Sequence, residues 1–155
     1  MKKVSVELEV VGVSGTKLIE VTSLDELHAA GAAHLGGEVR LFERDQDDEL
    51  ASLEGRTAIS VIAHRCLRIE VTVGYEHLSK SQHFRPGATV NRVLEWATGR
   101  RGFDLDDDAQ AKANLILPGA DQPLPPEAPI GRFVTAGTCN VTAELTLKDF
   151  TNGRA

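Results

Sequence analysis

The hydrophobic and polar positions at the start of the chain alternate with a period of two. Apolar side chains occupy every second position of 4–10, the pattern pauses at Ser14 and Gly15, and a second apolar run covers 18–21. Alternation on both sides of a turn is typical of a hairpin with one buried face. The beginning of the chain is therefore predicted to form two antiparallel strands.

A helix is expected next, within residues 23–37. Ser23 and Glu26 have the spacing of a capping box, in which both side chains accept hydrogen bonds from backbone N–H groups at the helix start. The two glycines at 36–37 can end the helix. Gly31 lies in its middle and lowers the intrinsic helix propensity.

Two short strands are predicted to complete this half of the chain. Residues 38–45 form a short alternating run, residues 46–55 are acidic and read as a loop, and residues 56–64 are rich in β-branched side chains. The predicted order is strand, strand, helix, strand, strand.

The same order then begins again. Residues 67–84 alternate about a turn near Gly74, which predicts a second hairpin. Residues 89–99 have the helical spacing i, i+3, i+4, i+7, with Thr89 as N-cap and Gly99 just past the end. The apolar positions with this spacing are Val90, Val93, Leu94 and Ala97.

The second copy is longer than the first because residues 100–112 are inserted after its helix. A short strand is expected at 113–117, and the Pro-rich segment 120–131 reads as an extended connector. Residues 132–150 are expected to supply one or two final strands, since polar and apolar residues alternate there from Asn140 onward.

Two copies of one pattern predict two similar units. A single helix over a mixed sheet is an α+β arrangement. We expect a first domain at 1–65 and a second at 66–150, joined without a Gly/Ser linker, followed by a flexible tail at 151–155.

Composition narrows the function classes. A hydrophobic fraction of 41% supports packed cores, and a net charge of −6 gives no electrostatic reason for a nucleic acid or anionic membrane partner. No apolar stretch is long enough to span a bilayer or to act as a signal peptide, so we expect a cytoplasmic protein. Cys66 and Cys139 form no C-x-x-C pair, and both are expected to be small, buried or half-buried thiols.

Enzyme motifs fail on spacing. The acidic runs at 45–49 and 104–108 lack the glycine and the final glutamate of a calcium loop, so both read as solvated acidic loops. No histidine pair has metal-ligand spacing, and no glycine-rich phosphate loop is present. The sequence therefore offers no catalytic, metal or cofactor-binding residue, and no cofactor is expected.

The remaining unusual feature is the sequence "DFTNGRA" after the last predicted strand. Glycine has no Cβ, so a tail ending in Gly153 could enter a narrow enzyme cleft, and its carboxylate could be activated there. Thr151 and Asn152 precede this glycine, and Arg154 and Ala155 follow it.

The repeated hairpin, helix and final strand with a glycine-ended tail resembles ubiquitin and its β-grasp relatives. The segments that carry the resemblance are "ATVNRVLEWATG", "NLILPG" and "CNVTAELTLKDFTNG", and more weakly "VSVELEV" with "TKLIEVTSLDELHAAG". Two such units with one tail resemble the tandem ubiquitin-like modifier of the interferon response. They also resemble bacterial tandem ubiquitin-like proteins of antiphage conjugation operons.

The resemblance implies a protein modifier rather than an enzyme. A JAB-type metalloprotease would cut after Gly153, a ubiquitin-activating-like enzyme would adenylate the new carboxylate, and a ubiquitin-conjugating-like enzyme would deliver it to a target lysine. The product would be an isopeptide bond, and in the bacterial systems the implied target is a phage virion component such as a tail protein. One departure is that Asn152 stands where such tails usually carry a second glycine.

Two alternatives stay open. The chain could be a β-grasp binding module or adaptor that holds a partner without being conjugated. It could also be an enzyme whose site assembles from residues far apart in the sequence.

Overall fold

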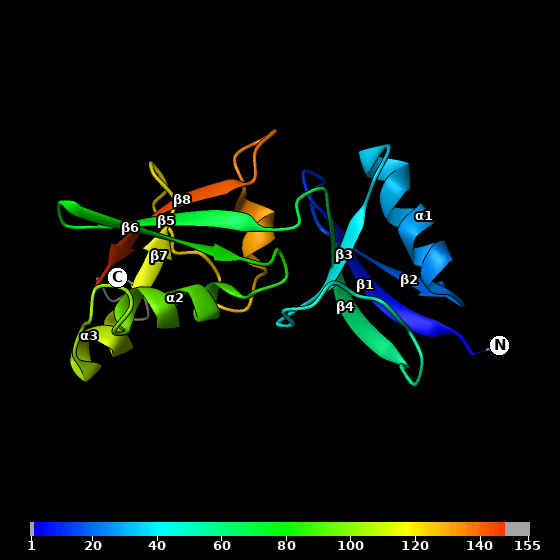
Figure 1. Ribbon diagram of the computed structural model, residues 1–155, viewed down its shortest axis with the longest axis horizontal. Helices are drawn as coiled ribbons and strands as arrows, with labels where there is room; N and C mark the ends of the chain where they lie inside the picture. The colour runs from blue at the N-terminus through cyan, green and yellow to red at the C-terminus, as the bar shows by residue number, and fades with distance from the viewer. Residues whose placement is uncertain (1, 148–155) are drawn as a thin grey trace.

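Two four-stranded sheets lie side by side, each with its own helix or helices (Figure 1). The computed structural model describes residues 2–147. The first unit contains β1 (Val4–Val10), β2 (Thr16–Val21), α1 (Leu24–Leu35), β3 (Arg40–Glu43) and β4 (Ala58–His64). The second contains β5 (Ile69–Tyr75), β6 (Leu78–Phe84), α2 (Val90–Thr98), α3 (Asp107–Lys112), β7 (Asn114–Ile116), the 3₁₀ helix η1 (Ile130–Phe133) and β8 (Asn140–Thr146).

The two sheets have the same topology. Their strand orders are β2-β1-β4-β3 and β6-β5-β8-β7. In each, the two central strands run parallel, and both edge strands are antiparallel to their neighbours. Each sheet also has a separate cluster of buried apolar residues. The α+β prediction of two ubiquitin-like β-grasp domains is therefore confirmed.

Helix α1 begins and ends where the sequence predicts. The hydroxyl of Ser23 accepts the N–H of Glu26, and the carboxylate of Glu26 accepts the hydroxyl and N–H of Thr22. The hydroxyl of Thr22 is the main reason why the pKa of Glu26 is lowered. Gly31 is buried, and a Cβ at this position would lie 3.0 Å from Cβ of Ala63. The glycine thus lets the helix pack close to β4.

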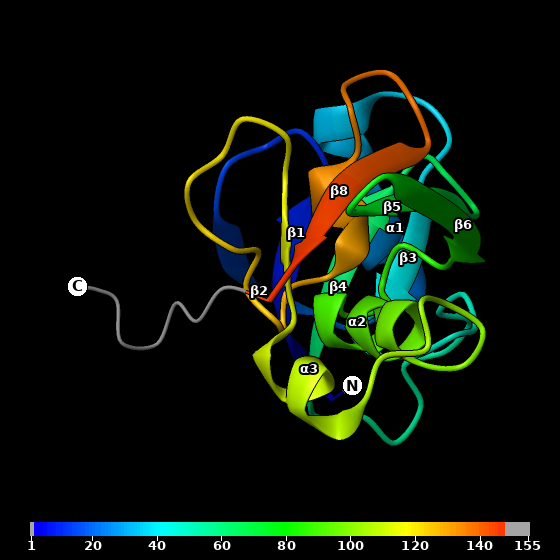
Figure 2. The ribbon, with the colours of Figure 1, turned by 90° about the vertical axis from the view of Figure 1, so that its left-hand side faces the viewer.

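The start of α2 is held by the Pro-rich segment. Thr89 caps the helix through its hydroxyl, as predicted. The N–H groups of Val90 and Asn91 donate to the carbonyls of Ala128 and Pro126, so the segment satisfies donors that a helix leaves free at its N-terminus. Figure 2 shows α2 and α3 together on one side of the second sheet.

One sequence expectation is wrong in the second unit. The acidic run 104–108 is not only a loop: the side chain of Asp106 accepts the N–H of Ala109 and caps α3. Of the one or two strands expected after residue 131, the described residues form one, because 130–133 form η1 and turns fill much of the stretch before β8.

The expectation of two free thiols is also wrong. Cys66 and Cys139 form a disulfide across a sequence separation of 73 residues, with their Cα atoms 5.9 Å apart. The two cysteines meet because β5 and β8 are parallel neighbours, with Glu70 near the start of β5 paired with Asn140 at the start of β8. The bridge therefore joins the connector after β4 to the entrance of β8. None of the helices within residues 2–147 has the length and apolar character needed to cross a bilayer.

Candidate functional site

The predicted conjugation residues lie outside the described part of the chain. These are Thr151, Asn152, Gly153, Arg154 and Ala155. What the structure describes is the strand that precedes them. β8 lies between β5 and β7 and is hydrogen-bonded to both. Residues Val141, Ala143 and Leu145 of β8 are buried, so the strand is fixed by its backbone and by its side chains.

The second feature of interest is the junction between the two units. One face of the first sheet covers its core, and the opposite face turns toward the second unit at one end. On that opposite face Phe42 and Ile62 are adjacent in the β3–β4 register, and both are almost completely buried. Neither belongs to the core cluster of its own unit. Residues of the second unit therefore cover them.

Two glycines allow this close approach. The carbonyl of Gly87 accepts the N–H of Asp45 at 2.8 Å, and a Cβ on Gly87 would lie 2.6 Å from the carbonyl oxygen of Glu43. A Cβ on Gly131 would lie 2.9 Å from Cδ2 of His64. Any larger residue at either position would push the two units apart.

A buried histidine links the end of β4 to η1. Nε2 of His64 lies 3.0 Å from the carbonyl oxygen of Gly131, and Nδ1 accepts the N–H of Cys66 at 3.0 Å. A neutral imidazole with its proton on Nε2 satisfies both contacts. Burial lowers the pKa of His64, and the charge of Arg65 acts in the same direction, while the bond to Gly131 opposes them.

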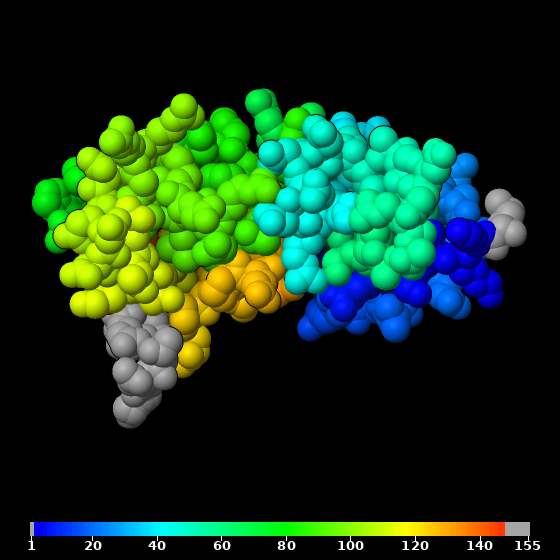
Figure 3. All heavy atoms as spheres, turned by 90° about the horizontal axis from the view of Figure 1, so that it is seen from below, coloured from blue at the N-terminus to red at the C-terminus, as the bar shows by residue number. Residues whose placement is uncertain are grey.

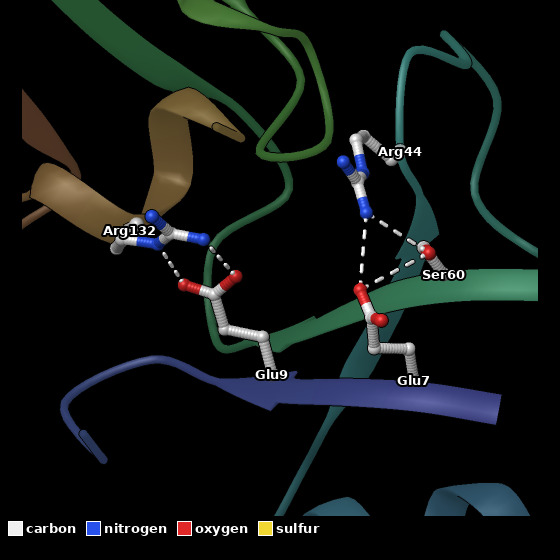
Figure 4. Close-up of polar contacts among 5 residues, drawn as sticks. All are labelled: Glu7, Glu9, Arg44, Ser60 and Arg132. Atoms are coloured by element: carbon white, nitrogen blue, oxygen red, sulfur yellow. Dashed lines mark hydrogen bonds and ion pairs between the residues drawn. The ribbon is translucent and has the colours of Figure 1, made fainter. Parts of the chain in front are cut away.

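An ion pair closes the same junction on the neighbouring strand. Both oxygens of Glu9 accept from the guanidinium of Arg132, with Nη2 to Oε1 at 2.8 Å (Figure 4). The Glu9 side chain is only 10% exposed, and the pair raises the pKa of Arg132. A second pair of the same sheet face, Glu7 with Arg44, lies entirely within the first unit.

A third contact joins α2 to the loop after β3. The guanidinium of Arg92 binds the carboxylates of Asp45 and Asp47 and the backbone carbonyl of Asp45. Figure 3 shows the cyan part of the first unit and the green part of the second unit in contact on the face that it draws. The two units are thus held together by the side chains of Glu9, His64 and Arg92 and by the backbone hydrogen bond from Asp45 to Gly87.

Sequence reasoning did not find this junction, although a signal was present. Phe42 and Ile62 are apolar at positions where the alternation of β3 and β4 points away from their own core. A solvent-facing sheet face would carry polar residues there. Two large apolar side chains at paired outer positions indicate a covering surface.

The junction has the properties of a structural interface rather than a reaction centre. Glu9 is paired with Arg132, and Arg92 is paired with Asp45 and Asp47. Within residues 2–147, no group of three His, Cys, Asp or Glu side chains could hold a metal ion. What the arrangement can do chemically is fix the orientation of two β-grasp units and present a firmly held last strand.

Comparison with known proteins agrees with the fold. No curated protein matches the chain at a significant level. A family model described as BilA ubiquitin-like domain 2 matches residues 70–148, which include every strand of the second sheet except the first residue of β5. This match covers just over half of the chain. The chain therefore belongs to the family of the BilA ubiquitin-like domain 2.

Proposed function

We propose that this ubiquitin-like protein is a covalent protein modifier, joined through the carboxylate of Gly153 to lysines of a target protein. The observation that carries the proposal is the family membership of the second unit together with the position of β8. In this arrangement a central strand, paired with β5 along 140–144 and with β7 along 144–146, comes shortly before Gly153 in the sequence. A folded domain followed by a short segment with a terminal glycine suits a substrate whose C-terminal residues must enter the active sites of several enzymes one after another.

The proposed route has three steps. A JAB-type metalloprotease hydrolyses the bond between Gly153 and Arg154. A ubiquitin-activating-like enzyme then adenylates the Gly153 carboxylate with ATP, releasing pyrophosphate, and passes the acyl group to a cysteine with loss of AMP. A ubiquitin-conjugating-like enzyme transfers the acyl group to a lysine amine, which leaves an isopeptide bond and a free thiol.

The biological setting is part of the proposal. We place the modifier in the bacterial cytoplasm, in antiphage defence, with a virion protein such as a tail protein as the target. This setting follows from the resemblance to bacterial tandem modifiers of antiphage conjugation operons. Thr151 and Asn152 are proposed to be the residues that the partner enzymes read before Gly153.

Three chains test the modifier function: the full sequence, a chain that ends at Gly153 and a chain that ends at Asn152. Each is co-expressed with the cognate protease, activating enzyme and conjugating enzyme, and its intact mass is measured. The full sequence should lose Arg154 and Ala155 only when the protease is present. The chain ending at Gly153 should be charged without the protease, and the chain ending at Asn152 should not be charged.

Charging is read as a thiol-sensitive adduct of the activating enzyme, and conjugation as a thiol-resistant adduct on a lysine. If the full sequence keeps Arg154 and Ala155 and neither adduct forms, the chain is not a modifier of this kind. If biological activity survives in the chain ending at Asn152, the non-conjugated adaptor is the correct function.

A further inference from the structure

A groove of about 370 Å³ opens where the two units meet, on the side of α2. Residues of both units and of the connector line it: Asp47, Arg68, His83, Phe84, Arg85 and Arg92. Arg68 comes from the connector, Arg85 follows β6, and Arg92 lies on α2. The groove exists only because the junction holds these segments together.

Two of the three arginines that line the groove, Arg68 and Arg85, bind no carboxylate among the described residues, and outside the groove the same holds for Arg65, Arg100 and Arg101. Five arginines bind a carboxylate of the chain: Arg40, Arg44, Arg56, Arg92 and Arg132. Arg85 instead donates to the backbone carbonyl of Leu67 at 3.1 Å, and Arg68 makes no hydrogen bond or ion pair with any of residues 2–147. In a chain with 23 acidic residues, two arginines on one groove are thus without a carboxylate among the described residues.

We propose that this groove binds an acidic segment of a partner protein, with Arg68 and Arg85 holding a carboxylate. The planar guanidinium forms paired hydrogen bonds with carboxylate and phosphate groups. Asp47 on the groove wall favours the singly charged carboxylate, because a doubly charged phosphate would be repelled more strongly. The half-buried ring of Phe84 offers an apolar contact for the methylene groups of a glutamate.

This binding surface is separate from the proposed conjugation. It needs the junction and the two arginines, and it does not need Gly153. A chain that ends at Asn152 should therefore bind the partner segment as well as the full chain does, even though it cannot be charged.

The test uses the full chain and a fluorescein-labelled hexaglutamate peptide, with fluorescence anisotropy as the readout. A hexaglutamine peptide and inorganic phosphate serve as comparison ligands. Binding of hexaglutamate should be saturable, hexaglutamine should not bind, and phosphate should compete only at much higher concentration. The R68E/R85E variant should bind at least about tenfold more weakly, the size expected for loss of one charge-assisted contact.

The matched control is R100E/R101E, which removes two exposed arginines that do not line the groove and changes the net charge by the same amount. It should change the affinity less than about twofold, since exposed charges act weakly over distance. The single variant R68E tests the site while leaving the hydrogen bond of Arg85 to Leu67 in place. Circular dichroism checks that this variant is folded.

Four results would overturn the proposal. They are absence of hexaglutamate binding, equal loss in both double variants, no loss in R68E/R85E, and phosphate binding as tight as hexaglutamate binding. The last would assign the groove to small anions rather than to an acidic protein segment.

Discussion

Burial at the junction between the two units constrains the ionisation of His64. Its imidazole lies at the junction, accepts the N–H of Cys66 and contacts the carbonyl of Gly131. Protonation would place a second proton on Nδ1, directly opposite the N–H of Cys66. Burial lowers its pKa, so the folded chain holds the neutral form.

The lowered pKa predicts a loss of stability on acidification. Between the folded and the unfolded pKa of His64, the unfolded chain binds more protons, so the free energy of unfolding rises with pH in that interval. It should therefore fall as the pH drops below about 6.5, by at most about 1.4 kcal/mol per pH unit for this one group. Urea unfolding at several pH values, followed by the fluorescence of Trp96, measures this free energy of unfolding.

Two variants separate His64 from the other histidines. H64Q should be less stable at neutral pH and should show a weaker dependence on pH in this range. H77Q changes an exposed histidine and should keep the dependence of the unchanged chain. If H64Q and the unchanged chain lose stability in parallel as the pH falls, another group is responsible.

At the scale of the element, α1 shows how a glycine can serve a helix that it weakens. Gly31 has a poor intrinsic helix propensity, yet because it has no Cβ, α1 can approach Ala63 and Val39. The contact lies in the core cluster of the first unit.

Gly31→Leu is expected to destabilise the first unit by about 1–3 kcal/mol, because the new side chain must displace β4 or the helix. Ala29→Leu, on the exposed side of the same helix, should change stability by less than about 0.5 kcal/mol. Denaturant midpoints measure the stability of both variants. Equal losses of stability would show that the close contact at Gly31 does not restrict side-chain size.

The elements themselves were largely predictable, because alternation, caps and terminal glycines are local signals. Ser23, Thr89 and Gly99 mark helix ends in the sequence and in the structure. Helix α3 was missed because three successive acidic residues resemble a solvated loop, and its cap at Asp106 is one of them. The disulfide was missed because its cysteines are brought together only by the parallel pairing of β5 and β8.

The whole molecule is two β-grasp units whose relative orientation is fixed by side chains. Phe42 and Ile62 are themselves buried on the outer face of the first sheet, and Glu9 and Arg132 form an ion pair beside them. The candidate site was therefore predictable only in part. The motif of the final segment can be recognised in the sequence, but a surface formed by two folded units cannot.

The Glu9–Arg132 pair should respond asymmetrically to substitution. Removing Arg132 leaves a carboxylate that is 10% exposed, whereas removing Glu9 leaves a guanidinium that is 39% exposed and open to water. R132Q should cost about 1–3 kcal/mol of unfolding free energy and E9Q less. A double-mutant cycle with E9Q/R132Q measures the coupling.

The pair of Glu7 and Arg44 is the control on the same sheet face. The Glu7 side chain is 49% exposed against 10% for Glu9, the two arginines are about equally exposed, and both Glu7 and Arg44 belong to the first unit. Its coupling should be below about 1 kcal/mol. A coupling for Glu7 and Arg44 as large as that for Glu9 and Arg132 would mean that the junction pair has no special role.

The disulfide changes how the chain would carry a mechanical load. Cys66 lies two residues after β4, and Cys139 lies one residue before β8. Once a pull on the end of β8 has broken its hydrogen bonds to β5 and β7, the covalent path to the first unit runs through the sulfur bridge and leaves out the 72 residues between the cysteines. While the disulfide is intact, an enzyme that pulled the chain from that end could not extend the loop between the two cysteines, which makes up most of the second unit.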